Sequence, residues 1–222
     1  MFIGHYAVAL SAKKAAPNIS LGTLFLAAQL VDLIWPIMLL LGIEHVKISP
    51  GNTAVTPLDF YDYPITHSLF GAIGWSVLML LFYFYIRRDI KDSLIIGFCV
   101  FSHWILDLIT HRPDLPLAPG NDKMFGMGLW NSLSGTLVLE VGLFALGVYL
   151  YFSTTSTKDK SGTYGFWSLV ILLLLIYFAN IFGSAPPDVS VLPYVGLLTW
   201  LFIPWAYWID RHRNFKIQII VH

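Results

Sequence analysis

Residues 100–114, with the sequence VFSHWILDLITHRPD, end a long apolar run and carry three side chains that can bind a metal ion. Such a run predicts a membrane helix, and His103, Asp107 and His111 occupy every fourth position in it. On an α-helix the three groups span roughly 80° of one face and about 12 Å along the axis. His103 and Asp107 are therefore the natural pair for one ion, with His111 one turn further along. Their nitrogen and oxygen atoms suit zinc, manganese or iron. The alternative is a membrane helix that simply carries a few polar groups near its end.

The composition identifies an integral membrane protein. Of the 222 residues, 57% are hydrophobic and 12% are charged, and the mean hydropathy is +0.70, far above that of a soluble chain of this size. The 13 Lys and Arg residues balance the 13 Asp and Glu residues, so the chain has no basic surface that would indicate nucleic-acid binding. Cys99 is the one cysteine and cannot form an internal disulfide.

Apolar runs long enough to cross the hydrocarbon of a bilayer, which takes about 20 helical residues, decide the predicted fold. They cover residues 20–43, 64–86, 93–111, 129–152, 164–183 and 190–209. The run at 2–12 is too short to cross and predicts a half-helix, interfacial or re-entrant, packed against the first span. Lys13 and Lys14 follow that run, whereas a signal peptide has its basic residues before the apolar stretch, so we expect no cleavage.

We therefore predict an all-α fold, a polytopic membrane helix bundle of about six transmembrane helices plus a short amino-terminal half-helix. The connections are brief, so we expect residues 1–222 to form a single integral membrane domain. Its motif-bearing core is expected at 1–152 and two further helices at 164–209.

The basic residues divide unevenly between the two sides of this bundle. Ten lie on the side of the termini, and three, Lys47, Arg112 and Lys123, lie on the other side. Loops rich in Lys and Arg remain in the cytoplasm, so we expect both termini to be cytoplasmic. The polar cluster of the third span would then lie in the outer half of the membrane.

Two carboxylates fall deep inside predicted spans. Asp32 lies about twelve residues, or roughly 18 Å, into the first span, and Glu140 lies at a similar depth in the fourth. A carboxylate there costs roughly 3 kcal/mol or more unless it is protonated, paired or bound to metal. Lys and Arg are absent from all six runs, which favours a bound metal ion. Glu140 is either a neutral carboxyl bonded to a neighbouring helix, or a group that orients a ligand or transfers protons.

His67 stands three residues after Pro64, and we expect both in the first turn of the second span, where proline is tolerated. Taken alone, a histidine there is more typical of the membrane interface than of a metal site. The acids Glu44, Asp59 and Asp114 are expected in outer loops, in contact with solvent.

Four short motifs follow one another along the chain: GHY at 4–6, Asp32, PITHS at 64–68 and SHWILD at 102–107. This order resembles the YdjM-like family of inner-membrane proteins, regarded as metal-dependent hydrolases. Its members carry an amino-terminal His, an Asp after the first long apolar helix, a Thr-His-Ser at a helix start and a Ser-His-x-x-x-Asp. The resemblance covers about residues 1–115 and implies the inner (plasma) membrane of a prokaryotic cell.

The helical His and Asp pattern is in turn similar to that of zinc-dependent phospholipase C and the related single-strand nucleases. This resemblance implies a principal metal site formed by Asp32, His67, His103 and Asp107, with His5 on a neighbouring ion bridged by Asp107. Where the family has Pro-Asp-x-Asp this chain has VDLI at 31–34, and DYP at 62–64 replaces its His-Arg-Gly. Whether two or three ions bind stays open.

Two hypotheses on function, from different classes, follow. The first is a membrane-embedded metal-dependent hydrolase, a phosphoesterase acting on a lipid or lipid-linked substrate through a metal-activated water. Its cofactor would be a divalent metal, zinc first, with manganese or iron as alternatives. His111 or Glu140 would transfer protons, Arg112 would bind substrate phosphate, and the loop 113–128 would cover the site.

The second hypothesis is a non-enzymatic membrane protein, either a metal or proton transporter or a partner-binding scaffold whose polar residues hold helices together. A lateral opening toward lipid favours the enzyme, and a continuous polar path to the cytoplasmic face favours the transporter. Neither hypothesis involves nucleic acid, and the oligomeric state is open.

Overall fold

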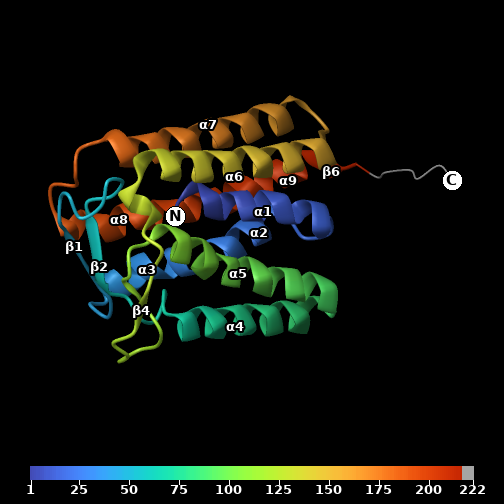
Figure 1. Cartoon of the computed structure of the whole chain (residues 1–222). Coiled ribbons are helices and arrows are strands. Elements are labelled where there is room, and N and C mark those ends of the chain that lie inside the picture. The colour runs from blue at the N-terminus through green and yellow to red at the C-terminus, as the bar shows by residue number, and fades with distance from the viewer. Residues whose placement is uncertain (217–222) are drawn as a thin grey trace.

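The computed structural model describes residues 1–216 and is a bundle of long apolar helices (Figure 1). Four single helices and one segmented stretch are each long and apolar enough to cross a membrane: α4 (Leu69–Arg87), α5 (Ile90–Thr110), α6 (Leu133–Thr154), α7 (Lys160–Phe182) and Val189–Arg211. The last comprises η2 (Val189–Val191), α8 (Leu192–Leu197), η3 (Leu198–Leu201) and α9 (Phe202–Arg211). The predicted all-α polytopic bundle is confirmed.

The first predicted span is broken into two helices. α2 (Leu21–Ala28) and α3 (Leu30–Leu40) meet at Gln29 and are bent by 55°; counted as one span they bring the candidate crossings to six. Carbonyls in the last turn of a helix lack partners within that helix, so the break frees acceptors at the end of α2.

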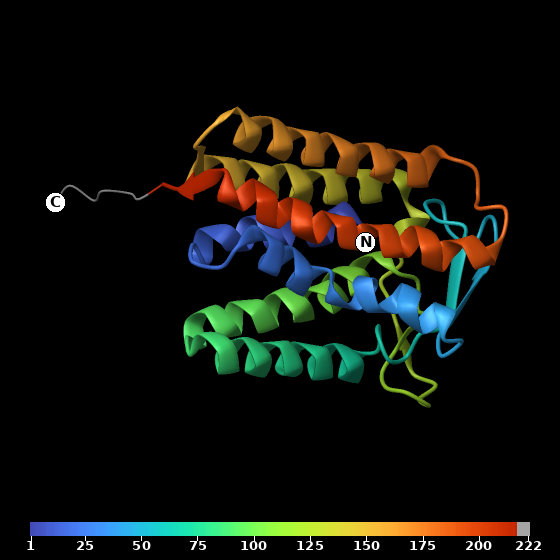
Figure 2. The ribbon, with the colours of Figure 1, turned by 180° about the vertical axis from the view of Figure 1, so that it is seen from behind.

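α1 (Ile3–Ala15) is the expected half-helix, and it lies inside the bundle against α6, α2 and α5 (Figures 1 and 2). Its contact with α6 is close, because Gly147 faces the backbone of Ala7 and a Cβ there would lie 2.7 Å from the Ala7 carbonyl oxygen. We expected the amino terminus beside the basic loops. Met1 instead lies buried within the bundle, and the other end of α1 reaches the basic end.

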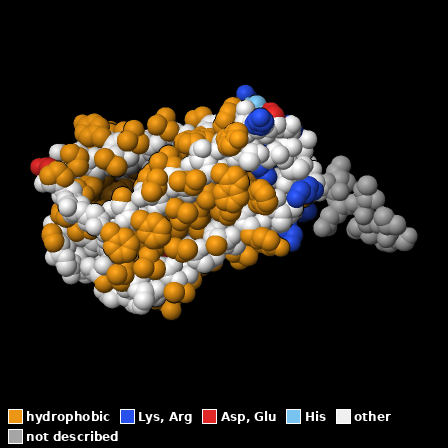
Figure 3. All heavy atoms as spheres, turned by 90° about the horizontal axis from the view of Figure 1, so that it is seen from above, with side chains coloured by type: hydrophobic (Ala, Val, Ile, Leu, Met, Phe, Trp, Pro, Cys, Tyr) orange, Lys and Arg blue, Asp and Glu red, His pale blue; other side chains and the backbone are white. Residues whose placement is uncertain are grey.

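The face of the bundle seen in Figure 3 is largely apolar, and the Lys and Arg side chains visible on it gather at one end. The connections α1–α2, α4–α5 and α6–α7 all lie at that end (Figure 1). α4 packs on α5 and exposes large apolar side chains such as Phe70, Leu78 and Phe82. A helix that is apolar on its exposed faces is suited to contact with the hydrocarbon chains of lipids.

Three short antiparallel strand pairs were not expected from the sequence. β1 (His45–Ile48) with β2 (Leu58–Asp62), and β3 (Leu115–Pro116) with β4 (Met124–Phe125), lie at the end opposite the basic loops. β5 (Thr155–Thr157) pairs with β6 (Arg213–Phe215) at the basic end.

Two predicted helix ends were wrong in ways that matter for the polar residues. α4 begins at Leu69, because Ser68 caps it by accepting a hydrogen bond from the Gly71 amide, so Pro64 and His67 lie in the turn before the helix. α5 ends at Thr110, and His111 already has extended backbone angles, in keeping with Pro113 two residues later.

Candidate metal centre

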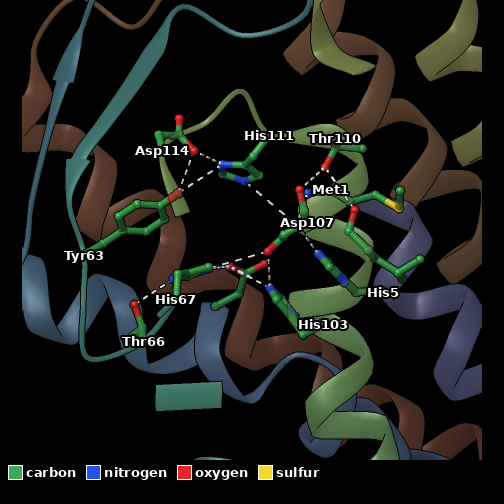
Figure 4. A network of polar contacts seen from close by, with 12 residues as sticks. Met1, His5, Tyr63, Thr66, His67, His103, Asp107, Thr110, His111 and Asp114 are labelled. Carbon is green, nitrogen blue, oxygen red and sulfur yellow. Dashed lines mark hydrogen bonds and ion pairs between the residues drawn. The ribbon is translucent and has the colours of Figure 1, made fainter. Parts of the chain in front are cut away.

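Four side chains from three parts of the chain meet inside the bundle (Figure 4). His103 and Asp107 lie one turn apart on α5, with His103 Nε2 3.2 Å from Asp107 Oδ2. Asp32 on α3 places Oδ1 3.5 Å from the same nitrogen, and His67, in the turn before α4, places Nε2 3.3 Å from Asp32 Oδ1. The ligand atoms of Asp32, His67 and His103 all lie within 4.8 Å of one another, close enough to hold one ion.

The hydrogen bonding of His103 leaves its inner nitrogen free for a metal. Nδ1 lies 2.8 Å from the Ala28 carbonyl, one of the acceptors at the α2–α3 break, and a carbonyl can only accept, so Nδ1 carries the proton. Nε2 is buried and has no hydrogen-bond partner among residues 1–216. A buried ring nitrogen that faces two carboxylates needs a proton or a cation between them, and a bound metal ion would turn all three groups into ligands.

His67 has the same tautomer for a different reason. Its Nδ1 lies 2.7 Å from the Thr66 hydroxyl, which itself donates to the buried Glu44 carboxylate at 2.7 Å. The hydroxyl oxygen can therefore only accept from His67, so Nδ1 is the donor, and Nε2 faces Asp32 Oδ1 at hydrogen-bond distance, 3.3 Å.

His5 approaches the opposite side of Asp107. His5 Nε2 lies 3.2 Å from Asp107 Oδ1, and its ring stacks on that of His103 with centroids 3.5 Å apart. The amino group of Met1 lies 2.5 Å from the same carboxylate oxygen. His5, His103 and Asp107 form a second group whose ligand atoms lie within 4.8 Å of one another, so Asp107 is shared between two candidate positions.

His111 lies at the rim of the centre. Its Nδ1 is 2.9 Å from Asp114 Oδ1, which also accepts a hydrogen bond from the Tyr63 hydroxyl at 3.0 Å, and its Nε2 lies 3.9 Å from Asp107 Oδ1. Trp130 packs on the imidazole with ring centroids 4.1 Å apart. Burial lowers the pKa of His111, which favours the neutral ring. A neutral ring with Nδ1–H on Asp114 presents a basic nitrogen to the centre.

Arg112 and Glu140 lie outside this cluster. The Arg112 guanidinium is paired with Asp59 on β2 and with Asp114, so it ties a hairpin to the end of α5; binding of substrate phosphate by Arg112 stays a prediction. Glu140 accepts a hydrogen bond from the Phe2 amide at 2.9 Å, which holds the start of α1 to α6. This contact is structural, and proton transfer by Glu140 stays a prediction.

The five residues expected as metal ligands, His5, Asp32, His67, His103 and Asp107, therefore converge. Sequence reasoning did not find the residues that orient them. Glu44, Asp59 and Asp114 were expected in solvent and are buried, because each accepts hydrogen bonds from groups near the centre. Thr66 stood inside a motif, next to His67, but nothing in the sequence indicated its partner 22 residues earlier.

Comparison with known proteins supports a family and no more. The chain has no significant match among curated proteins or solved structures. The family model described as YdjM inner membrane protein matches residues 2–187, which include every residue of the candidate centre. The chain therefore belongs to the YdjM inner membrane protein family, and its His and Asp cluster lies within the part that defines that family.

Proposed function

We propose that this chain is a membrane-embedded metal-dependent hydrolase that cleaves a phosphoester of a lipid or lipid-linked molecule. The observation that carries the proposal is the hydrogen bonding of His103 and His67. Both direct Nδ1 outward, to the Ala28 carbonyl and the Thr66 hydroxyl, and both direct Nε2 at carboxylates. A proton or a cation must lie between each Nε2 and its carboxylate, and a divalent ion would turn all of these groups into ligands.

The donor set of imidazole nitrogens and carboxylate oxygens suits zinc, with manganese or iron as alternatives. A bound divalent ion supplies two things to hydrolysis, a water acidic enough to lose its proton near neutral pH and polarisation of a phosphoryl oxygen. His111 is placed to accept that proton, because its Nε2 is 3.9 Å from Asp107 and Asp114 holds its Nδ1–H.

The exposure of the ligands supports an opening on the Asp32 side. The Asp32 side chain is 32% exposed, whereas His67, His103 and Asp107 are 7% exposed or less. α3 and α4, which flank this side, make few contacts with each other and α4 exposes apolar side chains around most of its surface. A substrate with a charged head group and apolar chains fits such an approach.

A transporter needs a polar path from its binding site to both membrane faces. The residues of α5 between the centre and the basic end are apolar, which favours the enzyme. From His103 toward the basic end, α5 buries Val100, Cys99 and Ile96 in the apolar core. This packing fits a centre that opens on one side.

Metal content tests the proposal. Purified wild-type protein should contain stoichiometric zinc by elemental analysis, and His103→Ala and Asp107→Ala should each lose it while remaining in the membrane. His45→Ala is the matched control, because His45 also pairs with a carboxylate, Asp62, but on the exposed surface. If both site variants keep stoichiometric zinc, the proposal is wrong.

Hydrolysis is then measured on two probes, phosphatidylglycerol in mixed micelles and the water-soluble bis(p-nitrophenyl) phosphate. The zinc-loaded wild type should cleave the lipid faster, and His103→Ala should cleave neither. Equal or better turnover of the soluble ester would contradict the lipid part of the proposal.

A further inference from the structure

We propose that Glu44, acting through Thr66, is a positioning residue that decides which nitrogen of His67 faces the metal centre. The inference rests on the proposed function, because it treats His67 as a metal ligand. Glu44 bonds to the turn before α4 and not to a candidate ligand atom, and its effect on the His67 ring would pass through the Thr66 hydroxyl.

Glu44 is a buried carboxylate, and a buried carboxylate is stable only when hydrogen bonds or a counter-charge compensate for the loss of water. It lies in the loop after α3, is 1% exposed, and accepts three hydrogen bonds. Two come from the backbone amides of Ile65 and Thr66, at 2.7 and 2.8 Å, and the third comes from the Thr66 hydroxyl at 2.7 Å. The amide bonds hold the turn before α4 in place. The third bond begins a chain of hydrogen bonds from Glu44 through the Thr66 hydroxyl to His67, in which each proton has a defined donor.

That direction follows from counting protons. An ionised carboxylate has no proton, so the bond between Glu44 and Thr66 must use the hydroxyl proton. The same oxygen lies 2.7 Å from His67 Nδ1 and has no second proton to give, so His67 donates. A neutral His67 then carries its proton on Nδ1 and has a lone pair on Nε2, the atom 3.3 Å from Asp32 and 3.9 Å from Asp107.

Without the hydroxyl, the other tautomer becomes favourable. Nε2 already lies in hydrogen-bond geometry with Asp32 Oδ1, 3.3 Å away, so a proton on Nε2 would be donated to that carboxylate and would close the ligand position. Glu44 and Thr66 therefore hold His67 in the form that can bind a cation, as outer partners of metal-bound histidines do.

A purely structural role for Glu44 is the alternative, and variants at Thr66 separate the two. Thr66→Val keeps the side-chain shape and the backbone amide that bonds to Glu44, but it removes the hydroxyl. Thr66→Ser keeps both the amide and the hydroxyl. We expect Thr66→Val to weaken zinc binding about 10- to 100-fold, measured by competition with a chromophoric chelator, and Thr66→Ser to bind like the wild type. Glu44→Gln should weaken binding as well, because its amide can donate to Thr66 and reverse the chain.

The tautomer is read directly from ¹⁵N spectra of histidine-labelled protein without metal, assigned with His67→Ala. The wild type and Thr66→Ser should have His67 protonated at Nδ1, and Thr66→Val should shift it toward Nε2. Melting temperatures in detergent check that all variants are folded.

The outcomes distinguish this inference from the function on which it rests. Wild-type protein that binds no zinc contradicts the proposed function, and the tautomer spectra then decide the role of Glu44 alone. The inference is overturned if Thr66→Val and Thr66→Ser have the same zinc affinity and the same His67 tautomer. Glu44 would then only hold the turn before α4 through its two amide bonds.

Discussion

Asp107 connects the two halves of the centre because its two oxygens face different partners. Oδ2 faces His103 and His67, and Oδ1 faces His5 and the rim histidine His111. A carboxylate used on both sides can bridge two ions about 4 Å apart, the spacing of two-metal hydrolytic sites. His111 is oriented toward this carboxylate by Asp114, which bonds to its Nδ1.

Asp114→Asn should separate catalysis from metal binding. Asp114 bonds to His111 Nδ1 and lies outside the ligand set, so the variant should keep its zinc by elemental analysis. Its turnover of phosphatidylglycerol should fall about 10- to 100-fold, because the amide no longer stabilises the ring that accepts the proton.

Asp62→Asn is the matched control, since Asp62 bonds to the exposed His45 in the same way. Loss of zinc from Asp114→Asn would mean that His111 belongs to the ligand set. Unchanged turnover of the variant would exclude His111 from proton transfer.

At the scale of elements, α1 makes a close backbone contact with α6. It carries His5 and packs along α6, where Gly147 leaves no room between the two backbones. Gly142, also on α6, has nothing within 4 Å of where a Cβ would stand. The two glycines therefore offer a matched pair.

Gly147→Leu should destabilise the protein by about 1–3 kcal/mol, because the added side chain meets the rigid backbone of Ala7. It should also reduce zinc content, since α1 can yield only by moving His5. Gly142→Leu should change neither the melting temperature in detergent nor the zinc content. An unchanged Gly147→Leu protein would show that α1 is held mainly by its other contacts, such as the Phe2 amide on Glu140.

The sequence predicted the elements better than their breaks. The length of an apolar run is set by the thickness of hydrocarbon, which is why all six runs correspond to helices. The bend at Gln29 has no Gly or Pro to mark it, and Pro36, the residue in that run with helix-breaking chemistry, lies inside α3. The bend is a tertiary effect, and it supplies the carbonyl that orients His103.

The candidate ligands were predictable because each interrupts an apolar run or sits in a motif, whereas their partners were not. Glu44 follows a span in sequence and is indistinguishable there from a solvated loop acid. Its burial depends on where the chain returns 21 residues later, at Ile65, and no periodicity encodes that contact.

At the scale of the whole molecule, charge separates the two ends. Lys13 and Lys14, in the last turn of α1, lie at the same end as the α4–α5 and α6–α7 connections (Figures 1 and 3). The candidate centre lies in the other half of the bundle, beside the start of α4 and the second half of α5. If the basic end faces the cytoplasm, the centre lies in the outer half of the membrane, as we propose.

Single-cysteine labelling tests this orientation. The natural Cys99 is buried in the core and should not react, so it needs no replacement. Lys158→Cys places an exposed thiol in the α6–α7 connection at the basic end, and Ser184→Cys places one after α7 at the opposite end. A membrane-impermeant maleimide added to intact spheroplasts should label Ser184→Cys at once and Lys158→Cys only after permeabilisation, with the wild type unlabelled in both. The reverse pattern would turn the bundle over and place the opening of the centre in the cytoplasmic half, where its lipid substrate would have to come from the inner leaflet.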